Sequence, residues 1–139
     1  MTLSSLHQDL IGCISMWCKN YASAKDFLVF EESVGESARE LPPAIDNYRP
    51  DVAWLRSTGA YEFIGEAKTA NDLKSKHTRN QLTAFLSRLD AQNSGELILA
   101  VPWGHEAYAT SMMRHLQTKL TISEKRWVVI SNAPGHGNG

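Results

Sequence analysis

The chain has 139 residues, a formal net charge of −1 and a hydrophobic fraction of 42%, which are ordinary values for a globular protein with one hydrophobic core. It contains no run of about 18 apolar residues and no basic segment followed by an apolar one at its start, so we expect neither a membrane span nor a signal peptide. Cys13 and Cys18 have the spacing of neither a CxxC redox pair nor a zinc site, and we interpret them as buried free thiols. The prediction is a single cytoplasmic domain over residues 1–139.

The first half of the sequence predicts one helix and three strands in chain order. Apolar residues recur every three or four positions over residues 3–21, which predicts a helix. Residues 26–34 are rich in β-branched and aromatic side chains and predict a strand, whereas the prolines and turn formers of residues 35–48 predict a loop. Further strands are predicted over 49–57 and 61–69, and the short link between them favours an antiparallel hairpin.

The second half alternates helices and strands. The predicted elements are a helix over 77–92, a strand over 95–102, a helix over 105–119 and a strand over 125–131, with 132–139 as a flexible tail beyond a core of about residues 3–131. The strand over 95–102 is almost continuously apolar, which is typical of a strand covered on both faces. The resulting order, αβββαβαβ, predicts an α/β fold with a mixed central sheet flanked by helices.

Charges are segregated along the chain. Residues 26–66 contain nine acidic residues and three arginines, whereas residues 68–88 contain five basic residues and one acidic residue. Two solvated faces would give this pattern, and so would a metal site beside a phosphate-binding surface. In the second case the phosphate contacts are predicted at Lys74, Lys76 and Arg79, at the start of the second long helix.

One end of the predicted hairpin gathers two carboxylates and a lysine. Side chains alternate along a strand, so Glu66 and Lys68 share one face, about 6–7 Å apart, and we expect Lys68 at the rim of the sheet. Asp51 follows Pro50 at the start of the preceding strand, and pairing around residues 58–60 brings it near Glu66. Two carboxylates suit Mg²⁺, or Mn²⁺ as a substitute, and a lysine beside them can position or activate a water. The group indicates phosphodiester hydrolysis.

These residues also carry a family resemblance. The segments Pro50-Asp51 and Glu66-Ala67-Lys68 resemble the signature of the PD-(D/E)xK nuclease superfamily, whose restriction-endonuclease-like fold has an αβββαβ core. The resemblance implies that Asp51 and Glu66 hold the metal, helped by the backbone carbonyl of Ala67. It also implies that Lys68 orients or activates the attacking water. The last predicted helix and strand would be additions to that core.

A third segment extends the resemblance to the second long helix. Gln81, in the stretch Q-L-T-A-F, is similar to the glutamine of the Q-h-x-x-Y motif of exonuclease-type members, with Phe85 in place of the tyrosine. The resemblance implies that Gln81 supports the catalytic end. Many members carry an acidic residue on the first helix, but Asp9, with His7 and Gln8 beside it, is interpreted here as part of a solvated face.

Two further groups are interpreted as structural. Glu31 and Glu32, at the end of the first strand, are expected to be exposed rim residues. The tryptophans Trp54, Trp103 and Trp127 lie in or beside strands, where we expect them to pack in the core rather than to stack on bases.

The leading hypothesis is a Mg²⁺-dependent DNA endonuclease or exonuclease, acting in repair, recombination, a mobile element or anti-phage defence. It would act alone, as a homodimer or within a larger assembly. A catalytically silent module of the same fold, binding nucleic acid or a protein partner, is the first alternative. An unrelated α/β domain, in which Glu66 and Lys68 form a surface ion pair, is the second. The first alternative is disfavoured by the joint presence of Asp51, Glu66 and Lys68.

Overall fold

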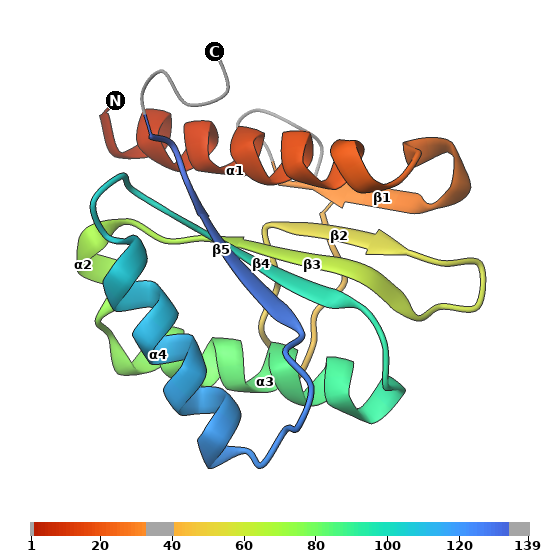
Figure 1. The fold of residues 1–139 in the computed structure, drawn as a ribbon. Coiled ribbons are helices and arrows are strands. Elements are labelled where there is room, and N and C mark those ends of the chain that lie inside the picture. Colours follow the sequence, from red (N-terminus) through yellow and green to blue (C-terminus); the bar gives the residue numbers. More distant parts are fainter. Residues whose placement is uncertain (1, 33–40, 134–139) are drawn as a thin grey trace.

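The computed structural model describes residues 2–32 and 41–133. They form a five-stranded sheet with α1 on one face and α3 and α4 on the other (Figure 1). The elements are α1 (Thr2–Tyr21), the 3-10 turn η1 (Ala24–Asp26), β1 (Leu28–Glu31), β2 (Val52–Leu55), β3 (Tyr61–Ala67), α2 (Ala70–Leu73), α3 (Lys76–Gln92), β4 (Glu96–Val101), α4 (Glu106–Lys119) and β5 (Trp127–Ser131). Within these ranges, no helix has the length and apolar character needed to cross a membrane.

The three predicted long helices are confirmed to within one residue at either end. The first strand was predicted too long, because residues 24–26 form the 3-10 turn η1; residues 33 and 34 lie outside the described residues. The short helix α2 was not predicted. Residues 35–40 of the predicted loop and 134–139 of the predicted tail also lie outside the described residues.

The sheet has the order β1-β2-β3-β4-β5. Its first three strands are antiparallel neighbours, whereas β3, β4 and β5 are parallel to one another. Parallel neighbours require a crossover connection, and α3 and α4 provide the two crossovers on the same face. The predicted antiparallel hairpin of β2 and β3 is confirmed, as is the general α/β architecture with a mixed, helix-flanked sheet.

Both faces of the central strands are buried. The face covered by α1 contains Trp54, Phe63 and Ile98, and the face covered by α3 and α4 contains Ile64 and Leu99. Burial on both sides explains the continuous apolar sequence of β4. It also places the face of β3 that bears Glu66 inside the protein rather than at its rim.

Gly65 allows α1 to lie directly against the hairpin. A Cβ atom at this position would be 2.6 Å from Ile14 Cγ2 and 3.0 Å from Val52 Cβ, which is too close for any side chain. His7 lies seven residues before Ile14 and therefore on the same face of the helix. The close contact at Gly65 thus brings the first turns of α1 to the end of β3 where the candidate site lies.

Candidate metal centre at the ends of the central strands

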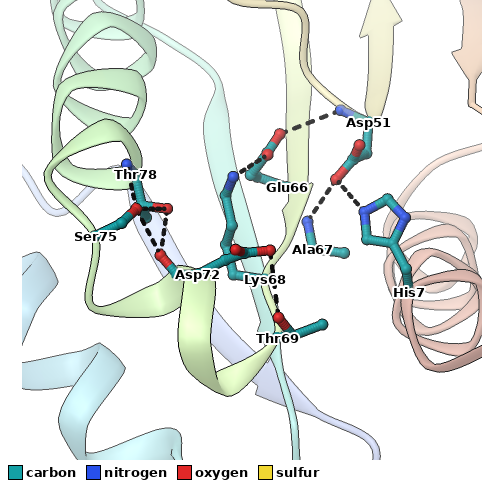
Figure 2. Close-up of polar contacts among 9 residues, drawn as sticks. All are labelled: His7, Asp51, Glu66, Ala67, Lys68, Thr69, Asp72, Ser75 and Thr78. Atoms are coloured by element: carbon teal, nitrogen blue, oxygen red, sulfur yellow. Dashed lines mark hydrogen bonds and ion pairs between the residues drawn. The ribbon is translucent and has the colours of Figure 1, made fainter. Parts of the chain in front are cut away.

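Asp51 and Glu66 meet where β2 begins and β3 ends (Figure 2). The backbone N–H of Asp51 donates to the Gly65 carbonyl at 3.0 Å and approaches Glu66 Oε1 at 3.3 Å. The backbone N–H of Ala67 donates to Asp51 Oδ2 at 2.8 Å. Pairing of the two strands therefore brings together carboxylates that are fifteen positions apart in the sequence.

Lys68 completes this group, but it does not lie at the rim as expected. Its Nζ is 3.1 Å from Glu66 Oε2, and the residue is only 9% exposed. Its backbone N–H donates to the Ala100 carbonyl at 3.0 Å, which extends the pairing of β3 with β4 past the end of β3. The lysine is therefore buried although it follows the last residue of β3, and the pattern of a single strand does not reveal what packs over its end.

Burial dominates the electrostatics of Glu66. The side chain is 3% exposed, and loss of solvation, followed by repulsion from Asp51, raises its pKa to about 8 against the attraction of Lys68. Near neutral pH this position therefore favours either a proton or an additional cation.

Two residues that the sequence did not assign to the site lie beside Asp51. His7 Nε2 is 3.3 Å from Asp51 Oδ2, and this contact raises the pKa of the imidazole (Figure 2). The backbone N–H of Glu32 donates to the Asp51 carbonyl at 2.8 Å. Burial, and then contact with Asp51, raises the pKa of the Glu32 carboxyl. Glu31 is exposed, as expected, whereas Glu32 is half-buried, because β1 pairs with β2 up to Glu31 and places the next residue beside Asp51.

The available donors suit a divalent cation. Among the described residues, one ligand atom each of His7, Glu32 and Asp51 lies within 4.8 Å of the others. This cluster shares Asp51 with the predicted pair of Asp51 and Glu66, so Asp51 is common to both sets of candidate ligands. Carboxylate oxygens suit Mg²⁺ and Mn²⁺, and the imidazole favours Mn²⁺ over Mg²⁺.

Gln81 is buried on α3 but is not connected to this group by a hydrogen bond. It is 6% exposed, and its Oε1 has no hydrogen-bond partner among the residues that the structure describes. Its supporting role remains a prediction. Asp9, by contrast, is exposed on α1, as the interpretation of a solvated face required.

The three predicted phosphate contacts lie on the surface just beyond the site. Lys74, Lys76 and Arg79 are exposed, and Arg79 Nη1 donates to the Lys74 carbonyl at 3.2 Å. Within residues 2–32 and 41–133, no carboxylate lies within 4.0 Å of any of the three charged groups. Their exposure is what a contact with an external anion would require.

A hydrogen-bond network fixes the segment between Lys68 and these cations (Figure 2). The hydroxyls of Ser75 and Thr78 donate to the Asp72 carbonyl at 2.9 and 2.6 Å, and Thr69 Oγ1 donates to the Asp72 carboxylate at 3.3 Å. Ser75 also caps α3 by accepting from the Thr78 N–H at 3.1 Å. The basic segment is therefore held at a defined position next to the carboxylates.

The tryptophans divide into two kinds. Trp54 and Trp127 are buried in the two core clusters, as predicted. The prediction for Trp103 is wrong, since 62% of this residue is exposed. It follows β4 in the turn that begins at Pro102.

Comparisons with known proteins add no relative. No family model matches the chain, and no curated protein or solved structure matches it. The resemblance to the nuclease superfamily therefore depends on the residues of this chain and on their geometry.

Proposed function

We propose that the chain is a metal-dependent nuclease of the PD-(D/E)xK type, which hydrolyses phosphodiester bonds of DNA. The observation that carries this proposal is the convergence of Asp51, Glu66 and Lys68, all buried, at one end of two paired strands. Buried ionisable groups are costly, and clusters of them with a shifted pKa are typical of functional sites. A surface ion pair, as in an unrelated α/β domain, would instead leave Glu66 and Lys68 exposed.

The fold supports the same proposal. The order α1, β1, β2, β3, α3, β4 agrees with the αβββαβ order expected for a restriction-endonuclease-like core, apart from the short helix α2. The mixed sheet with helices on both faces also agrees with it. The candidate site lies at the carboxyl end of β3, which is where open α/β sheets commonly bind ligands.

Each residue then has a defined role. Asp51 and Glu66 would hold the metal, with the Ala67 carbonyl, His7 and Glu32 as further ligands. A bound divalent ion would polarise the phosphate and lower the pKa of a water. Lys68 Nζ, which is held at 3.1 Å from Glu66 Oε2, has hydrogens to donate to that water or to a phosphate oxygen. Gln81 would support the site from α3.

The exposed cations extend the site toward its substrate. Lys74, Lys76 and Arg79 would contact phosphates of the DNA on one side of the scissile bond. The ordered segment from Thr69 to Thr78 would keep these contacts at a fixed distance from Lys68.

Substitution of Lys68 tests the proposal. Because the lysine is buried against Glu66, methionine is a better replacement than alanine: it keeps most of the volume and removes only the charge. Lys68→Met should lower metal-dependent cleavage by a factor of about 10² or more, and Lys68→Arg should not restore full activity, because a guanidinium neither fits nor transfers a proton as an ammonium does. Lys19→Met, at an exposed lysine of α1, is the matched control and should cut like the wild type.

The assay is cleavage of linear, nicked, single-stranded and branched DNA with Mg²⁺ or Mn²⁺, alongside a thermal unfolding measurement of each variant. Cleavage by a folded Lys68→Met protein at the wild-type rate would refute the role of the lysine. If the wild type binds DNA but cuts no member of the panel, the catalytically silent module is the better description.

A further inference from the structure

The turn between β4 and α4 presents a tryptophan to solvent. Trp103 is 62% exposed, whereas Trp54 is 1% and Trp127 2% exposed. An indole ring has a large, flat apolar surface on which a ligand can stack. Neither the packing of the sheet nor the metal centre uses this side chain.

The backbone that carries Trp103 is firmly held. The His105 N–H donates to the Pro102 carbonyl at 3.0 Å, which closes a four-residue turn around Trp103 and Gly104. Gly104 has φ +95°, a value that favours glycine. The Trp103 N–H donates to Asn132 Oδ1 at 2.8 Å, and the Gly104 N–H donates to Glu106 Oε1 at 2.7 Å. The exposed ring is thus attached to an ordered turn, which lowers the entropic cost of binding.

A second exposed aromatic side chain, which contacts a cation, follows Trp103 by five residues in the sequence. Tyr108, in the first turn of α4, is 42% exposed, and Lys74 Nζ lies 5.6 Å from the centre of its ring. Arg79 is joined to the Lys74 carbonyl by its guanidinium. We call Trp103, Tyr108 and Lys74 the aromatic surface.

The turn that carries Trp103 follows the strand that pairs with the segment of Lys68. The carbonyl of Ala100 accepts from the Lys68 N–H at 3.0 Å, and Trp103 follows Ala100 by three residues. At about 3.3 Å per residue, the Cα atoms of Ala100 and Trp103 are at most about 10 Å apart. A nucleic acid strand that reaches Lys68 is therefore within reach of Trp103.

We propose that Trp103 and Tyr108 stack on unpaired bases of single-stranded DNA, while Lys74 and Arg79 neutralise its phosphates. Bases in a duplex are stacked on one another, so their faces are available only where the strand is unpaired. Aromatic side chains beside positive charge bind single strands with little sequence preference, because every base has a π-face. This inference rests on the proposed nuclease function and narrows its substrate to single strands or single-stranded ends.

Binding measured without metal tests this inference separately from catalysis. Fluorescence anisotropy with a labelled single-stranded 12-mer, and with the same strand in a duplex, would be recorded in EDTA. Trp103→Ala and Tyr108→Ala should each weaken single-strand binding by a factor of about 5 to 100 and leave duplex binding within about twofold of the wild type. Lys74→Gln should weaken the binding of both the single strand and the duplex. Tyr21→Ala removes an aromatic residue that is 68% exposed at the far end of α1, and it should change neither (Figure 1).

Intrinsic fluorescence identifies the contacting ring. Binding of an unlabelled 12-mer should quench the exposed tryptophan, and Trp103→Phe should lose most of this quenching while it keeps single-strand affinity within about threefold of the wild type.

The inference is overturned if the wild type binds no single-stranded DNA, or if the Ala variants bind it as well as the wild type does. An equal loss of single-strand and duplex binding would also overturn it. If stacking is found but no substrate is cut with metal, the nuclease proposal fails and the stacking surface stands. If DNA is cut while the Ala variants bind single-stranded DNA as well as the wild type does, the stacking inference fails and the nuclease proposal stands.

Discussion

Replacing Glu66 with glutamine should remove most of the pH dependence of folding stability in the metal-free protein. Burial and the neighbouring Asp51 raise the pKa of Glu66 from its ordinary value of 4.5 to about 8. In this range the folded protein holds a proton that the unfolded chain has released. The free energy of unfolding must therefore fall as the pH rises from about 4.5 to about 8, and it is highest below this window.

The size of the effect follows from the two pKa values. At about 1.4 kcal/mol for each pH unit, the interval between 4.5 and about 8 corresponds to a loss of about 5 kcal/mol. This is a large part of the stability of a typical domain, about 5–15 kcal/mol. His7, whose pKa is raised by Asp51, adds a further loss of the same sign above its ordinary value of 6.5.

Urea unfolding in EDTA at pH 5, 6, 7 and 8, followed by far-ultraviolet circular dichroism, measures this dependence. Glu66→Gln should leave only a smaller slope, which comes from Glu32, Glu96 and His7, because the pKa of each of these groups is also raised. Glu62→Gln, on the same strand at a half-buried position, is the control and should keep the wild-type slope. Added Mn²⁺ should raise the stability of the wild type at pH 8, because it would occupy the place of the lost proton. A slope in Glu66→Gln equal to that of the wild type would refute the reasoning.

Two other results would define the site. Calorimetry should find an Mn²⁺ affinity at least tenfold lower in Asp51→Asn than in the wild type. Asp9→Asn, at an exposed carboxylate of α1, is the control and should bind Mn²⁺ like the wild type. Equal Mn²⁺ affinity in Asp51→Asn and the wild type would exclude the site. Replacing Lys74, Lys76 and Arg79 together with alanine should weaken DNA binding and reduce the slope of log affinity against log salt concentration by about two to three, whereas an unchanged slope would mean that these cations contact no phosphate.

Much of this fold was predictable because its helices are amphipathic. The periodic apolar residues of 3–21, 77–92 and 105–119 identified all three long helices. The strands were found too, but their ends were less accurate: residues 49–51, 56–57 and 68–69 were predicted as strand and lie outside β2 and β3. A strand ends where its partner ends, and the sequence of one strand does not contain that information.

The core of the candidate site was predictable for a similar local reason. A short link between two strands fixes an antiparallel pairing, and this pairing alone brings Asp51 to Glu66 and Lys68. Alternation along the strand then places Glu66 and Lys68 on one face. These relations involve residues within eighteen positions of one another, so sequence spacing was sufficient.

Two features of the site depended on contacts between elements that are far apart in the sequence. His7 reaches Asp51 because the absence of a side chain at Gly65 lets α1 lie against the hairpin. Glu32 reaches it because β1 pairs with β2 across a long connection. Sequence spacing says nothing about either approach.

Exposure was the other property that only the tertiary structure decided. The sequence indicated a rim lysine and a core tryptophan, and the structure reverses both: Lys68 is 9% and Trp103 62% exposed. Whether a side chain is buried depends on what packs over the end of its strand. Here Lys68, whose backbone continues the pairing of β3 with β4, is buried, whereas Trp103, in the turn after β4, is left in solvent. The sequence by itself thus determined which chemical groups meet at the hairpin, and the packing of distant elements decided which of them are buried and what surrounds them.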